Sequence, residues 1–92
     1  MDERIIFSMI QSMIENDALI IETGHARLRM SQRGINTEDI IYILKNPTYI
    51  KKVSESAVIA DRYNYRVVGK FDWSVVVSID YPSKLIIVTV ID

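Results

Sequence analysis

The hydrophobic residues of this 92-residue chain change their spacing at Pro47. Before Pro47, apolar residues recur at the spacing of one side of an amphipathic helix. After Pro47, they form short runs rich in β-branched and aromatic residues, which favour strands. Helices followed by strands predict an α+β fold, in which the helices pack against an antiparallel sheet. The length suits one domain with a single hydrophobic core, over residues 1–92.

The N-terminal segment has the most regular helical pattern. Between residues 3 and 15, the apolar side chains form one stripe and the polar side chains lie opposite. We therefore expect a helix there, within an N-terminal segment 1–16, and the remainder of the core in residues 17–92. The short apolar run 18–22 is bounded by Asn16-Asp17 and Thr23-Gly24, so it predicts a strand.

Two further helices are predicted before Pro47. The first starts at Gly24 and ends at Gly34, because glycine readily adopts the left-handed conformation that closes helices. The second starts after Asn36, which suits an N-cap whose reciprocal partner is Asp39. It ends where Asn46 is followed by proline.

The second half of the chain predicts a meander. A turn is expected near Asp72 and another at the YPSK stretch, residues 81–84, and these connections are too short for parallel crossovers. We expect three or four antiparallel strands among the runs 49–53, 57–60, 63–71, 73–79 and 85–91.

Both faces of this sheet should be covered, because apolar residues occupy both alternation phases in VVVSI and LIIVTVI. The two middle helices can cover one face. The N-terminal helix, or a second copy of the protein, can cover the other, and we expect a homodimer for a domain this small.

The charges limit the classes of partner and chemistry. Lysine and arginine number 11 and aspartate and glutamate 12, so any polyanion must bind a local patch. The absence of cysteine fits a cytoplasmic protein, and no stretch resembles a signal peptide or a membrane span. With one histidine and scattered glycines, we expect neither a metal site nor a cofactor.

The stretch GHARLRMSQRGIN, residues 24–36, contains the only histidine and no acidic side chain. On a helix, His25, Arg29 and Arg33 follow one another along one side, whereas Arg27 points away. Guanidinium groups bind phosphate oxygens, and imidazole carries a proton near neutral pH. These three residues are the catalytic candidates.

The same spacing also fits a structural role. His25 would then hydrogen bond to a backbone group near the helix start, while the arginines pair with Glu22, Glu38 or Asp39 and cover the core with their stems.

A second basic set lies in DRYNYRVVGKF, residues 61–71. At the period of a strand, one face carries Arg62, Asn64, Arg66 and Lys70, and the other carries Tyr63, Tyr65, Val67 and Phe71. Basic residues on a sheet face can follow a phosphate backbone, and a tyrosine can stack on a base. The RNA-binding candidates are therefore Arg62, Tyr65, Arg66 and Lys70. The alternative is a solvated strand face, and if the short helix packs on the aromatic side, the basic side points away from His25.

The motifs HARLRM, QRGIN, EDIIYIL, NPTYI, YRVVGKF and LIIVTVID resemble the domain-of-unknown-function family 4258. The resemblance covers about residues 23–92 and leaves out the helix within residues 2–16. The activity of this family is unassigned. Its order of elements is similar to that of RelE and ParE type toxins from toxin-antitoxin modules, which is an analogy at the level of the fold.

This resemblance implies one function and leaves others open. A RelE-like protein would be a toxin or metal-independent endoribonuclease, with RNA as substrate and an antitoxin-like protein as partner. The basic residues named above would contact RNA and promote attack by a 2′-hydroxyl on its phosphodiester. The alternatives are a noncatalytic module that docks an acidic protein, and a structural homodimer in which His25 and Arg33 hold the helix-to-strand junction.

Overall fold

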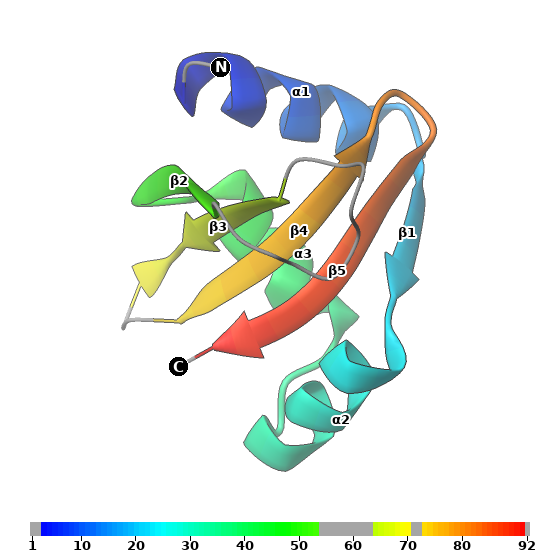
Figure 1. Cartoon of the computed structure of the whole chain (residues 1–92), viewed down its shortest axis with the longest axis vertical. Coiled ribbons are helices and arrows are strands. Elements are labelled where there is room, and N and C mark those ends of the chain that lie inside the picture. Colours follow the sequence, from blue (N-terminus) through cyan, green and yellow to red (C-terminus); the bar gives the residue numbers. More distant parts are fainter. Residues whose placement is uncertain (1–2, 54–63, 71–72, 92) are drawn as a thin grey trace.

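The computed structural model describes residues 3–53, 64–70 and 73–91. In this part of the chain, the helices and strands follow one another in the predicted order, which confirms the α+β fold (Figure 1). The predicted strand at 57–60 and the turn near Asp72 lie outside the described residues. The elements are α1 (Glu3–Glu15), β1 (Leu19–Glu22), α2 (Gly24–Arg33), α3 (Thr37–Lys45), β2 (Tyr49–Val53), β3 (Asn64–Val68), β4 (Ser74–Asp80) and β5 (Lys84–Ile91).

The strands form one sheet in the order β1-β5-β4-β3-β2. Strands β2 to β5 pair as antiparallel neighbours, which confirms the predicted meander. Strand β1 adds to it parallel to β5, with Ile20 opposite Leu85. The long intervening chain allows this parallel pairing, which a short connection would not. The end of β1 leads directly into α2, so this pairing places α2 beside β5.

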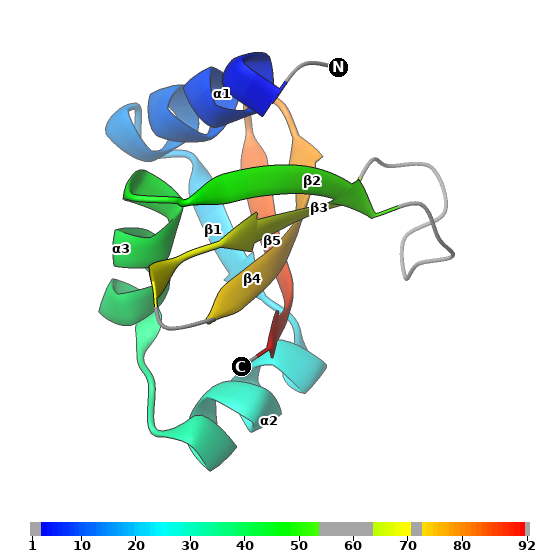
Figure 2. The same cartoon turned by 90° about the vertical axis from the view of Figure 1, so that its left-hand side faces the viewer.

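Helices α1 and α3 cover the same face of the sheet (Figure 2). The buried stripe of α1, which contains Ile6 and Ile10, joins one core with Ile40 and Leu44 of α3 and Val67 of β3. The expectation that the N-terminal helix covers the opposite face is therefore wrong. The two helices are also tied by the Gln11 side chain, whose Nε2 donates a hydrogen bond of 2.7 Å to the Leu44 carbonyl.

The opposite face of the sheet is apolar at its centre. Val76, Ile86 and Val88 are at most 8% exposed there, and Ile21 and Ile91 pack against them. No helix of the described part of the chain belongs to this cluster. Apolar residues on both faces explain why the alternation in β4 and β5 is incomplete.

The predicted helix boundaries are confirmed. Gly34 has φ 70° and closes α2. Asn36 and Asp39 form a reciprocal capping box at the start of α3. Asn46 ends α3, since Pro47 follows and disfavours helical backbone at the residue before it. None of the described helices is both long enough and apolar enough to cross a membrane.

Candidate functional site

Two side-chain hydrogen bonds, one at the start of helix α2 and one further along it, hold the helix against β5. The Thr23 hydroxyl caps the helix by accepting from the Ala26 backbone N–H at 3.0 Å, and it donates to the Val88 carbonyl at 2.9 Å. Further along, Arg29 Nε donates to the Val90 carbonyl at 3.3 Å. Ala26 and Met30 are buried against the same core. These contacts fix which side of α2 faces away from the sheet.

The three catalytic candidates occupy one side of α2, and we call His25, Arg29 and Arg33 the basic face. His25 and Arg33 are exposed, and Arg29 is half-buried. No described residue forms a hydrogen bond or ion pair with the His25 side chain, whereas Arg33 does have an interaction partner. The bond to Val90 uses only Nε of Arg29, so the guanidinium is oriented while its two terminal nitrogens are not used in that bond.

Arg27 lies apart from the basic face, as the helical period predicts. Its Nε is 3.9 Å from Oε1 of Glu22, and its side chain is 73% exposed. Ion pairs this exposed are strongly screened and contribute little stability. The pairing with Glu22, expected for a structural role of the arginines, therefore applies to Arg27.

The strand candidates are divided between different parts of the molecule. Arg62 lies outside the described residues. Tyr65 is 4% exposed and belongs to the core beneath the helices, so its ring is not accessible for stacking on a base. Arg66 lies on the opposite face, half-buried, and its Nε donates to the Ser74 hydroxyl at 2.9 Å. The period-two alternation is confirmed within β3, and it separates Tyr65 from Arg66.

Lys70 does not share the face of Arg66, so this part of the prediction is wrong. The alternation ends because β3 stops at Val68. Gly69 then donates its N–H to the Trp73 carbonyl at 2.7 Å, and a Cβ on Gly69 would come within 3.0 Å of the Ile43 side chain. This close approach brings the chain after β3 against α3. Lys70 consequently lies on the helix side.

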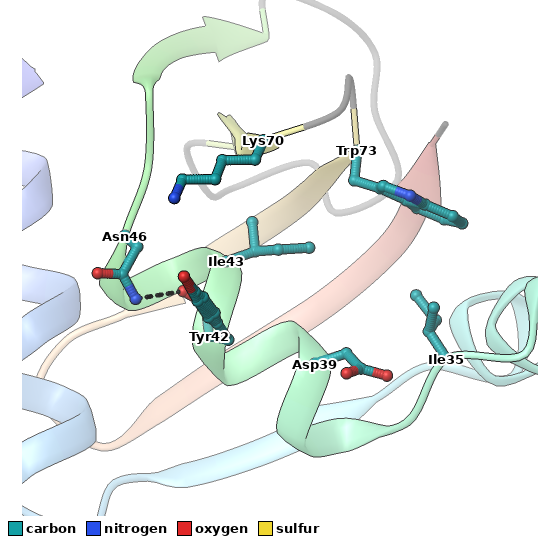
Figure 3. Close-up of a pocket in the computed structure, with 7 residues that line it drawn as sticks. All are labelled: Ile35, Asp39, Tyr42, Ile43, Asn46, Lys70 and Trp73. Carbon is teal, nitrogen blue, oxygen red and sulfur yellow. Dashed lines mark hydrogen bonds between the residues drawn. The ribbon is translucent and has the colours of Figure 1, made fainter.

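Lys70 lines a cavity of about 230 Å³ between α3 and the end of β3, which we call the α3 pocket (Figure 3). Its lining residues are Ile35, Asp39, Tyr42, Ile43, Asn46, Lys70 and Trp73. Apart from Lys70, none of these was a candidate in the sequence. Two signals in the sequence point to it: the single tryptophan lies just after the turn predicted near Asp72, and Tyr42 interrupts the isoleucines of α3.

The α3 pocket adjoins the C-terminal end of the basic face. Ile35 lines the pocket and follows Arg33 after one residue, Gly34. On the other side, Trp73 directly precedes β4, whose first residues pair with Val90 and Ile91. The Val90 carbonyl is the one that Arg29 binds. The fold therefore places Lys70 in the same pocket as Ile35, but leaves Arg66 on the other side of the sheet.

Two buried polar atoms lack a partner on the face that carries Arg66. Asn64 Oδ1 and Ser78 Oγ belong to side chains that are 3% and 0% exposed, and neither atom forms a hydrogen bond with another described residue. The two residues are direct cross-strand neighbours.

Metal-binding side chains do not gather in the described part of the molecule. Within residues 3–53, 64–70 and 73–91, no group of three or more histidine, cysteine, aspartate or glutamate side chains is arranged to hold a metal ion.

Comparison with known proteins gives one match. Neither the curated proteins nor the solved structures contain a match to this chain. A family model described as domain of unknown function (DUF4258) matches residues 22–92. This range begins at the end of β1, so it contains the basic face and the α3 pocket and leaves out α1. Because the match spans well over half of the sequence, the chain belongs to the DUF4258 family.

Proposed function

We propose that the protein is a metal-independent endoribonuclease similar to RelE type toxins, and that the basic face of α2 is its catalytic surface. One observation carries the proposal. An exposed imidazole without a described partner lies on the same side of α2 as two guanidinium groups, one of which is oriented by the Val90 carbonyl. An anion that binds the two guanidinium groups would therefore lie on the same side of α2 as His25.

The reaction assigned to this surface is cleavage of RNA by its own 2′-hydroxyl. A neutral nitrogen of His25 accepts the hydroxyl proton, and the 2′ oxygen forms a bond to the adjacent phosphorus. The bond from phosphorus to the 5′ oxygen breaks, and water donates a proton to that oxygen. The products are a 2′,3′-cyclic phosphate and a 5′-hydroxyl, and the imidazolium returns its proton to solvent.

The arginines stabilise the negative charge that develops on the phosphoryl oxygens. Guanidinium groups hold phosphate oxygens through paired N–H donors, and a donor that is already oriented needs no rearrangement in the transition state. Arg29 meets this requirement through its bond to Val90, and Arg33 extends the same side by one helical turn.

The partners follow from this assignment as part of the proposal. A toxin of this kind acts on cellular RNA and is held inactive by an antitoxin-like protein, and the small domain functions as a homodimer. The net charge of −1 gives no overall attraction to RNA, so we expect weak nonspecific binding that depends on the local basic face.

The test is cleavage of a defined single-stranded RNA at low salt in the presence of EDTA. We expect 2′,3′-cyclic phosphate ends and no cleavage of the same sequence made with 2′-deoxyribose. His25→Ala should lower the rate by a factor of about 10²–10⁴. Arg27→Ala is the matched control, because it removes a cation from the same helix but outside the basic face. Intact RNA at all protein concentrations would end the proposal.

A noncatalytic interaction module is the second candidate, and the anchoring of α2 favours it. Thr23 and Arg29 bind carbonyls of the same strand, which holds the surface of α2 in a fixed position for docking and requires no chemistry. This candidate predicts salt-sensitive capture of an acidic protein, and an Arg29→Glu variant that folds but no longer binds. In the structural homodimer, truncating His25 or Arg33 would lower the melting temperature and alter no ligand.

A further inference from the structure

The α3 pocket has the size and walls of a site for one flat ring. Its volume of about 230 Å³ is below the range of roughly 300–1,000 Å³ typical of sites for drug-sized ligands and cofactors. Ile43 lies between Trp73 on one side and Tyr42 on the other (Figure 3). Tyr42 is 49% exposed although it is aromatic, so part of the residue is accessible to a ligand. Aromatic side chains bind nucleobases of any sequence by stacking.

The Asp39 carboxylate is an acceptor on the α3 side of the pocket. Asp39 uses Oδ2 to accept from the Asn36 backbone N–H at 2.9 Å, which leaves Oδ1 for a ligand. Asn46 donates one N–H of Nδ2 to the Tyr42 carbonyl at 3.0 Å, which leaves its Oδ1 and its second N–H (Figure 3). An ionised carboxylate only accepts hydrogen bonds. The edge of a bound ring that faces Asp39 must therefore carry N–H donors.

Among the four RNA bases, guanine presents adjacent N–H donors on its Watson–Crick edge, at N1 and N2. Adenine and cytosine each place a ring acceptor beside their amino group, and uracil flanks its single N–H with two carbonyls. An acceptor directed at a carboxylate is repelled, so a carboxylate in a base site favours guanine. A good bidentate contact to a base contributes roughly tenfold or more in affinity over the wrong base.

Lys70 supplies the cation for the attached phosphate. Its side chain is exposed, and its ammonium group lies at the rim on the side of Asn46 (Figure 3). No hydrogen bond or ion pair joins the Lys70 side chain to another described residue. Ile35 of the pocket wall lies two residues after Arg33 in the sequence, so the wall is close along the chain to the end of the basic face.

We propose that the α3 pocket binds a guanine base of single-stranded RNA, with the ring against Trp73 and Tyr42, its N–H edge on Asp39 and its phosphate on Lys70. This inference rests on the proposed function, since it places the neighbouring nucleotides of the same strand along the basic face of α2. The protein would then select its cleavage sites by a guanine close to the scissile phosphate.

The fluorescence of Trp73 reports occupancy of the pocket directly, because it is the only tryptophan of the chain. Titration with GMP, AMP, CMP and UMP should quench it at a GMP concentration about tenfold lower than for the other nucleotides. Tyr42→Ala and Lys70→Ala should each weaken GMP binding several-fold. Asp39→Asn keeps an acceptor for the Asn36 N–H, so it should fold and lose the preference for guanine. Tyr49→Ala is the matched control, because Tyr49 is also a surface tyrosine, 45% exposed, and lies outside the pocket.

The outcomes separate the pocket from the proposed function. GMP preference that depends on Asp39, in a protein that cleaves no RNA, supports the base site and overturns the nuclease. RNA cleavage that requires His25, with no nucleotide quenching Trp73, overturns the base site and leaves the nuclease standing. Quenching by N-acetylleucinamide but not by GMP would overturn the base site as well, because the pocket would then receive an apolar side chain of a protein.

Discussion

The Arg29 guanidinium gives the sharpest test of the basic face, because one side chain there has both a structural and a proposed functional contact. Arg29→Met keeps the aliphatic stem and removes the donor to Val90. The bond is 3.3 Å long, just beyond the usual range for N–H···O bonds, and the side chain is half-buried. We therefore expect a loss of about 1 kcal/mol in unfolding free energy. In a domain of this size, that lowers Tm by roughly 4–8 °C.

Arg29→Lys separates the two contacts. Lysine has no nitrogen at the position of Nε, so its Tm should fall as far as that of Arg29→Met. It keeps the positive charge, and the logarithm of RNA affinity falls with the logarithm of salt concentration by about 0.7 for each phosphate contact to a single strand. Arg29→Met should therefore reduce this slope by about 0.7, whereas Arg29→Lys should preserve it.

The measurements are thermal unfolding by circular dichroism and RNA binding by fluorescence anisotropy at several salt concentrations. Arg27→Met is the control, because that side chain is 73% exposed and its only described ion pair is the long one to Glu22. Its Tm and salt slope should match those of the wild type. An unchanged Tm in both Arg29 variants would refute the anchoring to β5, and an unchanged slope in Arg29→Met would refute the phosphate contact.

Three further substitutions test the frame around the site. Thr23→Val removes the cap of α2 and the bond to Val88, so urea unfolding should show a loss of about 1–3 kcal/mol; a loss below about 0.5 kcal/mol would contradict the two bonds. Ile10→Ala should lower the unfolding free energy by about 2–5 kcal/mol, because Ile10 is fully buried in the core although α1 lies outside the family match. Ile5→Ala, at a position that is 51% exposed, should keep the unfolding free energy within about 0.5 kcal/mol of the wild type. Gly69→Ala places a Cβ 3.0 Å from the Ile43 side chain, so it should lower the unfolding free energy by about 1 kcal/mol and weaken the quenching of Trp73 by GMP. Unaltered quenching would show that the Ile43 side chain moves without changing the pocket.

The secondary structure could be predicted from the sequence because its causes are local. The apolar stripe of α1, the glycine after Arg33 and the capping pair Asn36 and Asp39 act within a few residues of one another. The alternation in β3 likewise predicts that Tyr65 and Arg66 lie on opposite sides of the sheet, and they do. The family motifs also lie within short stretches of fixed spacing, and the match over residues 22–92 confirms the resemblance.

The position of each candidate side chain depended on the tertiary structure. Periodicity places Lys70 on the wrong face, because it cannot show that β3 ends at Val68 and that Gly69 packs on Ile43. The apolar stripe of α1 predicts that the helix is buried on one side, but it does not specify which face of the sheet the helix covers. Contact with α3 places α1 on the same face as α3. The bond from Arg29 to Val90 joins residues 61 positions apart. The amino-acid sequence alone thus determined which side chains each helix and strand carries, because helix and strand preferences are local. Only packing between distant segments decided which of these side chains meet, because such contacts leave no periodic pattern along the chain.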